Sequence, residues 1–111
     1  MGLDTDFDCW HGPYSAFHRW RKEIAASIGI DLDKMDGFAE NGSAWNMADP
    51  ICKLLHHSDC DGQIDAADCL PIAIRLIELY PTLSDSAKLR VSLFAHGLIN
   101  AHLAGLPVEF H

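Results

Sequence analysis

The stretch HSDCDGQIDAAD, residues 57–68, decides the fold. Asp59 and Asp61 alternate with other residues just before Gly62, and two further aspartates follow that glycine. Apolar residues with helical spacing flank the stretch on both sides. Hard cations need several oxygen ligands that converge within a short loop. The stretch therefore predicts a helix–loop–helix unit with a candidate cation site in its loop.

The twelve positions of this acidic loop (residues 57–68) align with those of an EF-hand loop. Gly62 takes the sixth position, where the chain turns sharply, and Ile64 takes the position of the apolar residue that anchors the loop to the core. The predicted metal ligands are His57, Asp59, Asp61, Gln63 (through its backbone carbonyl), Asp65 and Asp68. The predicted ion is Ca²⁺ or Mg²⁺.

Two positions depart from the EF-hand pattern. His57 replaces an aspartate at the first position, and Asp68 replaces the longer glutamate at the twelfth. Pro71 would break a backbone hydrogen bond inside a helix that began at Ala66, so we expect Asp68 to cap the helix and Pro71 to lie in its first turn. The alternative interpretation is a turn that keeps the shape of an EF-hand loop and binds no ion.

Helix signals outside the loop complete the predicted architecture. Pro13 suits the first turn of a helix, Gly29 suits a helix end, and Asp49-Pro50 begins a short helix. Ser84 or Asp85 caps a last helix that ends at Gly105. The predicted helices cover about residues 13–28, 50–56, 69–80 and 85–104. The sequence thus predicts an all-α bundle of about four helices in one domain, residues 1–111, with a non-helical tail.

Composition limits the function classes. The chain has 111 residues, of which 49% are hydrophobic and 22% charged, as is usual for one globular domain. Its formal net charge of −8 argues against binding to nucleic acid or to an anionic membrane, because both need a basic surface. The first ten residues lack the basic-then-apolar pattern of a secretory signal. We therefore expect a cytoplasmic protein.

Histidines and cysteines offer a second metal chemistry. Zn²⁺ prefers sets of Cys, His and carboxylate ligands. The residues available for such a set are Cys9, His11, His56, His57, Cys60 and Cys69. Their spacing matches no zinc-finger signature, so zinc is the alternative to calcium or magnesium, and the cysteines are predicted to serve mainly in packing.

An enzyme is the rival from another class. The chain contains no P-loop, GxSxG or HExxH motif. A small metal-dependent enzyme would use Asp8, His11, His57 and Asp59, and would need a deep pocket that joins them. A third alternative is a structural or interaction protein that binds no ion.

Several sequence blocks resemble a family of small bacterial and phage proteins of unestablished function. The resembling blocks are Gly2-Leu3-Asp4, Asp8-Cys9-Trp10-His11-Gly12, Tyr14-Ser15-Ala16-Phe17, Arg19-Trp20-Arg21, His57-Ser58-Asp59-Cys60-Asp61-Gly62 and Glu109-Phe110-His111. The resemblance implies that the N-terminal loop, the acidic loop and the C-terminal tail belong to one arrangement. The chain departs from the family pattern at the acidic Asp4–Asp8 stretch and around residues 41–46.

From this resemblance we expect the three segments to converge, with Asp8, His11 and His111 near Asp59 and Asp61. Arg19 and Arg21 would then balance carboxylates or bind an anion. The leading hypothesis is a non-enzymatic interaction module that binds a divalent metal ion. A lone EF-hand usually needs a partner to complete it, so a protein partner or self-association is also expected.

Overall fold

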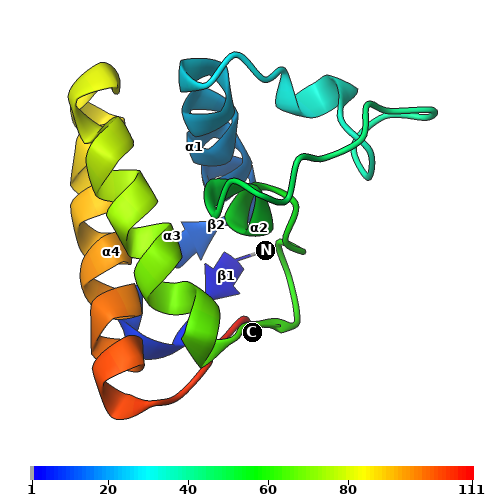
Figure 1. Ribbon diagram of the computed structural model, residues 1–111. Coiled ribbons are helices and arrows are strands. Elements are labelled where there is room, and N and C mark those ends of the chain that lie inside the picture. Colours follow the sequence, from blue (N-terminus) through cyan, green and yellow to red (C-terminus); the bar gives the residue numbers. More distant parts are fainter. Residues whose placement is uncertain (1) are drawn as a thin grey trace.

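Two long helices form an antiparallel hairpin along one side of the molecule (Figure 1). The computed structural model describes residues 2–111. The hairpin consists of α3, Ala66–Leu79, the 3-10 turn η3, Tyr80–Thr82, and α4, Asp85–Ala104. The side chain of Ser84 accepts the Ala87 N–H at the start of α4, and Gly105 ends α4 with a φ of 69°. Both ends of the last helix therefore match the prediction.

The other two helices come earlier in the chain. They are α1, Tyr14–Ser27, and the short α2, Ile51–Leu55. Gly29 follows α1 with a φ of 78°, as expected for a residue just past a helix end. The long connection between α1 and α2 contains one 3-10 turn, η2, Leu32–Lys34, and extends away from the α3–α4 hairpin (Figure 1).

The all-α prediction is wrong, because the structure is mixed and contains two small antiparallel sheets. The first sheet pairs β1, Gly2–Asp4, with β2, His11–Pro13. The second pairs β3, Gln63–Ile64, with β4, Val108–Glu109. Strands of two or three residues carry too little periodicity to be seen in a sequence, and β4 lies more than forty residues from its partner.

The C-terminal tail joins the two sheets. Thr5 and Phe110 form an antiparallel bridge, and Asp4 and His111 exchange two backbone hydrogen bonds of 3.3 and 2.8 Å. On its other side the tail pairs with the acidic loop, where the Phe110 N–H donates to the Gly62 carbonyl at 2.9 Å. The tail therefore lies between the N-terminal strand and the acidic loop, and its backbone groups find partners on both sides.

Aromatic residues fill the core beneath the tail and the N-terminal segment. The ring centroids of Trp10 and Trp20 lie 5.4 Å apart, and those of Trp20 and Phe94 lie 5.1 Å apart. Phe17 contacts Trp10 and Phe110 edge-on. All of these aromatic residues are buried. The core thus connects α1, α4, the N-terminal segment and the tail.

Arg21 is the large charged side chain of the interior, with 1% of its surface exposed. Its Nη1 donates to the carbonyls of Leu54, Leu55 and His57 at the end of α2. Burial lowers the pKa of Arg21 to about 10, which leaves the guanidinium charged at neutral pH. Arg21 therefore fixes the start of the acidic loop against α1.

Within residues 2–111, no helix has the length and apolarity that a membrane crossing requires.

Candidate functional site

The acidic loop keeps the backbone shape that its sequence predicts. Gly62 has a φ of 81°, a conformation that favours glycine and turns the chain sharply. Ile64, in the anchor position, is 3% exposed and belongs to the core. The strand that an EF-hand loop offers to a partner is here paired with β4 of the same chain. The loop is thus closed without a second copy.

The ring of His57 lies where it engages a carbonyl predicted to bind the ion. Its Nε2 is 2.9 Å from the backbone oxygen of Gln63, and its Nδ1 is 2.7 Å from that of Ser58. The ring also packs against Phe110 in a tilted arrangement, with centroids 4.2 Å apart. A carbonyl oxygen only accepts, so a ring nitrogen donates to its carbonyl when it carries a proton. Through these two contacts His57 links the two sides of the loop.

The carboxylates predicted as ligands of the loop do not share one cavity, because Asp65 and Asp68 line one and Asp59 lines another. Asp65 accepts a hydrogen bond from the Gln63 side chain at 2.8 Å, and Asp68 pairs with Lys53 at 2.6 Å. Asp59 lines a cavity with Arg21 and His57 that does not include Asp65 or Asp68. Within residues 2–111 these carboxylates form no group of three with ligand atoms inside 4.8 Å. An ion in the loop would require these side chains to move.

Asp68 also fails to cap α3 as expected. The helix begins at Ala66 after the extended residue Asp65, and Pro71 lies inside it. The Asp68 carboxylate pairs with Lys53 instead of capping the helix, and the Asp68 N–H donates to the Asp65 carbonyl at 2.9 Å. The thiol of Cys69 donates to the same carbonyl at 3.4 Å.

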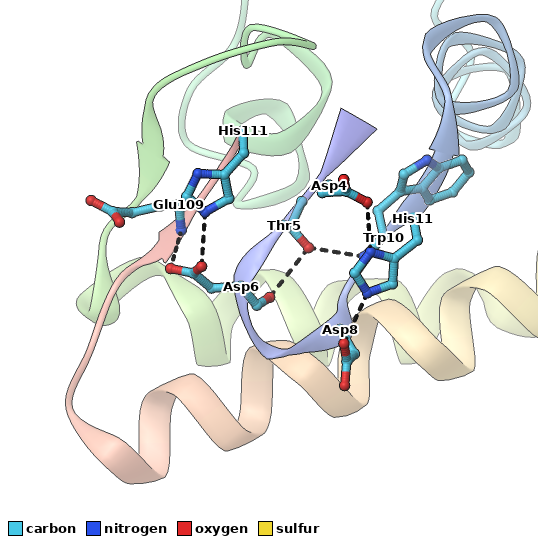
Figure 2. A network of polar contacts seen from close by, with 8 residues as sticks. All are labelled: Asp4, Thr5, Asp6, Asp8, Trp10, His11, Glu109 and His111. Atoms are coloured by element: carbon cyan, nitrogen blue, oxygen red, sulfur yellow. Dashed lines mark hydrogen bonds and ion pairs between the residues drawn. The ribbon is translucent and has the colours of Figure 1, made fainter. Parts of the chain in front are cut away.

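A second group of potential ligands forms where the two ends of the chain meet (Figure 2). Ligand atoms of Asp6, Glu109 and His111 all lie within 4.8 Å of one another, and this is the one such group in residues 2–111. We call it the terminal cluster. The Nε2 of His111 lies 2.9 Å from one carboxylate oxygen of Asp6, and the other accepts the Glu109 N–H at 3.3 Å. The cluster thus offers one nitrogen and two carboxylates.

Beside the terminal cluster lies a second histidine between two aspartates. The Nδ1 of His11 is 2.8 Å from Asp4, and its Nε2 is 2.8 Å from Asp8. Phe7 and Asp8 adopt left-handed backbone angles, with φ of 59° and 56°, in the tight turn that brings Asp8 back toward His11. Figure 2 shows this group and the terminal cluster on either side of the N-terminal segment.

Charge around the two histidines is strongly negative. The hydrogen bonds that His11 donates to Asp4 and then to Asp8 raise the pKa of His11, and the one that His111 donates to Asp6 raises the pKa of His111. The same contact with His111 lowers the pKa of Asp6. Four carboxylates thus surround two imidazoles, and the surplus of negative charge favours a bound proton or another cation.

The expected convergence of three segments is found at the level of the backbone, since the tail pairs with both the N-terminal strand and the acidic loop. The side-chain contacts differ from those expected, because His111 binds Asp6 and the neighbour of Asp8 is His11. Sequence reasoning missed Asp6 and Glu109. The alternating aspartates of DTDFD resembled a solvated loop, and no local signal pairs them with the tail.

Cysteines contribute little to any of these groups. Cys9, Cys52 and Cys69 are buried, whereas Cys60 is exposed, and all four are free thiols. Burial raises the pKa of Cys9 to about 12 and that of Cys69 to about 11, so both thiols stay protonated at neutral pH. Metal binding and nucleophilic attack both need the thiolate. Packing is therefore the role that the structure supports for these two.

The four residues of the enzyme alternative lie in two places. Asp8 and His11 contact each other in the N-terminal segment, whereas His57 and Asp59 line a cavity beside Arg21. Five cavities border residues within 2–111, and neither Asp8 nor His11 lines any of these five. The joint deep pocket that such an enzyme needs is thus not among them.

Comparison with known proteins adds no further identification. The chain matches no protein-family model, no curated protein and no solved structure. The resemblance to small bacterial and phage proteins therefore stays a prediction, and the function has to be argued from the geometry.

Proposed function

We propose that this protein is a non-enzymatic module that binds a divalent cation at the terminal cluster of Asp6, Glu109 and His111. The observation that carries the proposal is the convergence of three ligand atoms within 4.8 Å from opposite ends of the chain. One imidazole nitrogen and two carboxylates form a mixed set that suits Zn²⁺ or another transition ion such as Mn²⁺. Water would complete the coordination.

Electrostatics supports the same choice. The chain carries a formal net charge of −8, and four of its carboxylates surround His11 and His111. Because the hydrogen bond to Asp6 raises the pKa of His111, a metal ion competes with a proton for this imidazole up to a higher pH than at a free histidine. Metal affinity at this cluster therefore increases with pH until His111 is fully deprotonated.

Binding at this position would act on the fold. Asp6 and His111 are 105 residues apart, so an ion between them would hold the tail against the N-terminal segment. The tail in turn pairs with the acidic loop. An ion that binds only the folded state stabilises it by mass action, so the metal would stabilise the paired N-terminal segment, tail and acidic loop together.

The acidic loop is the second candidate, for Ca²⁺ or Mg²⁺. The φ of 81° at Gly62 and the strand at Gln63–Ile64 favour it, because both are features of an EF-hand loop. Binding there would require His57 to release the Gln63 carbonyl and Asp68 to release Lys53. We therefore rank the acidic loop below the terminal cluster.

Calorimetric titration of the chelator-treated, tag-free protein with Zn²⁺, Mn²⁺, Ca²⁺ and Mg²⁺ separates the two sites. The test variant is Asp6→Asn with Glu109→Gln, and the matched control is Asp59→Asn with Asp61→Asn, which removes the same charge from the acidic loop. We expect one Zn²⁺ site whose affinity falls at least about tenfold in the test variant. An equal loss in the control, or no saturable Zn²⁺ binding, would reject the proposal.

The partner and the location also remain proposals. Because β4 completes the acidic loop within one chain, self-association would use another surface. Ile74, Ile77 and Leu103 on the α3–α4 hairpin are large apolar residues exposed to 50%, 53% and 77%. Sedimentation of the protein against an Ile77→Glu variant tests self-association there. The cytoplasmic location stays a prediction from the sequence.

A further inference from the structure

A cavity of about 360 Å³ lies between α1 and the start of α4, away from the carboxylates of the terminal cluster. Its lining includes Trp10, Arg19, Trp20, Glu23, Ser86 and Arg90. It is within the lower part of the size range of small-molecule sites. Two guanidinium groups border it, which is unusual in a chain with eight basic and sixteen acidic residues.

Neither guanidinium has an acidic partner in the described part of the chain. Lys22, Lys34, Lys53 and Arg75 form ion pairs with aspartates, and Arg21 is bonded to carbonyls. Within residues 2–111, no ion pair involves Arg19 or Arg90. The two arginines without polar partners thus border the same cavity.

The one carboxylate of the cavity is already engaged. Glu23 accepts the Ser84 N–H at 2.7 Å with one oxygen and the Ser84 hydroxyl at 2.8 Å with the other. These contacts hold α1 against the start of α4. Two positive charges therefore face one carboxylate that is committed to the N-cap of a helix, and the cavity is a positive region on an acidic protein.

An unpartnered buried donor provides independent evidence. Trp10 is 1% exposed, and its Nε1 has no hydrogen-bond partner in the structure. A Cβ atom at Gly12 would lie 3.5 Å from this Nε1 and 3.7 Å from an Nη2 of Arg90. The indole Nε1 and the Arg90 guanidinium therefore lie near the same point beside Gly12, and both residues line the cavity. A buried N–H without a partner is costly, and a ligand acceptor would satisfy it.

The aromatic floor and the helix start add to this arrangement. The guanidinium of Arg90 lies over the ring of Trp10, 4.2 Å from its centroid, which orients it at the cavity. Ser86 belongs to the first turn of α4, whose free N–H groups and helix dipole favour negative charge. Asp85 is the acidic residue of that turn but does not line the cavity, so the donors that do line it favour an anionic group.

We propose that this cavity binds the oxyanion group of a small molecule, a phosphate or a carboxylate. Arg19 and Arg90 supply the charged donors, because planar guanidinium groups match both anions in pairs of hydrogen bonds. The indole N–H of Trp10 supplies a neutral donor. The proposal is independent of the cation site, since the two share no residue.

Calorimetry with inorganic phosphate and with succinate at low ionic strength tests the proposal, with sodium chloride of equal ionic strength as the blank. The variants are Arg19→Gln and Arg90→Gln, and the matched control is Lys88→Gln, which removes one positive charge from α4 near Tyr80 and outside the cavity. We expect one saturable site whose affinity falls about tenfold or more in each arginine variant and changes less than twofold in the control.

The outcomes distinguish the two anions. Binding of phosphate alone identifies phosphorylated ligands, and binding of succinate alone identifies carboxylates. No saturable binding of either anion, or an equal loss in Lys88→Gln, overturns the proposal. Because Arg90 packs on Trp10, its variant is checked for folding by circular dichroism. Arg19 makes no such contact with Trp10, so the Arg19→Gln variant provides the decisive comparison if the Arg90 variant unfolds.

Discussion

The imidazole of His111 lies 2.9 Å from the carboxylate of Asp6, so a residue of the C-terminal tail is tied to the first turn of the chain. The backbones of these two segments are also paired, through the Thr5–Phe110 bridge and the hydrogen bonds between Asp4 and His111. Since the tail also pairs with β3, this contact connects the N-terminal segment to the acidic loop. Its strength should therefore influence both.

Stability should fall as the pH rises through the range in which the two histidines lose their protons. His11 and His111 have raised pKa values in the folded protein, so each contributes stability that is fully present below its unfolded pKa of about 6.5. That contribution is lost as the pH passes upward through the folded pKa. Denaturant unfolding from pH 5.5 to pH 9 should show this decline.

The variant His11→Gln with His111→Gln should flatten the pH profile between those limits. His102→Gln is the control, because His102 is an exposed histidine of α4 outside both groups. A profile that keeps its slope in the double variant would show that other groups cause it.

Replacing Phe110 by alanine should destabilise the protein by about 3–5 kcal/mol, because a buried aromatic ring is lost from the core. The ring packs against His57 and contacts Phe17 edge-on. Leu106→Ala in the same tail is the control and should cost less than about 0.5 kcal/mol, since Leu106 is 52% exposed. Urea unfolding monitored by circular dichroism measures both, and equal effects would contradict the packing described.

Gly97 should not tolerate even a methyl group. An added Cβ would lie 2.4 Å from the Cys9 sulfur and 2.7 Å from the Phe7 carbonyl, so the N-terminal turn would have to move away from α4. We expect Gly97→Ala to destabilise by about 1–3 kcal/mol despite the better helix propensity of alanine. Asn100→Ala, at an exposed position of α4, is the control and should be nearly neutral. Thermal melts of both variants measure the difference. A stabilised Gly97→Ala variant would show that this contact is looser.

His57→Asp should create or strengthen Ca²⁺ binding in the acidic loop by at least about tenfold. The change restores an oxygen ligand at the first position and frees the Gln63 carbonyl from the imidazole. His56→Asp is the matched control, because it makes the same charge change one residue away. Calorimetric Ca²⁺ titration of both variants decides, and equal gains would mean that charge alone is responsible.

The helices could be predicted because their signals are local. Ser84, Gly105 and Gly29 mark helix ends within a few residues of the chain they terminate. The strands could not, because β4 and the Thr5–Phe110 bridge depend on partners far away in sequence. Pro71 was misleading in the opposite direction, since α3 continues through this exposed proline despite the lost hydrogen bond, with Cys69 and Ile72 of the same helix buried in the core.

The candidate site shows the same division. The turn at Gly62 and the burial of Ile64 follow from the local pattern of the acidic loop. The contact of His57 with the Gln63 carbonyl and the pairing of Asp68 with Lys53 depend on side-chain geometry that no spacing encodes. The terminal cluster combines residues 6, 109 and 111, so it exists only once the tail has paired with the N-terminal segment.

Anomalous scattering at the zinc absorption edge, from crystals grown with equimolar Zn²⁺, tests the cation site most directly. We predict one peak about 2.0–2.1 Å from the Nε2 of His111, in contact with carboxylate oxygens of Asp6 and Glu109. The peak should disappear in crystals of the Asp6→Asn, Glu109→Gln variant. A peak within the acidic loop instead, or a Zn²⁺-free cluster beside an intact Asp6–His111 contact, would contradict it.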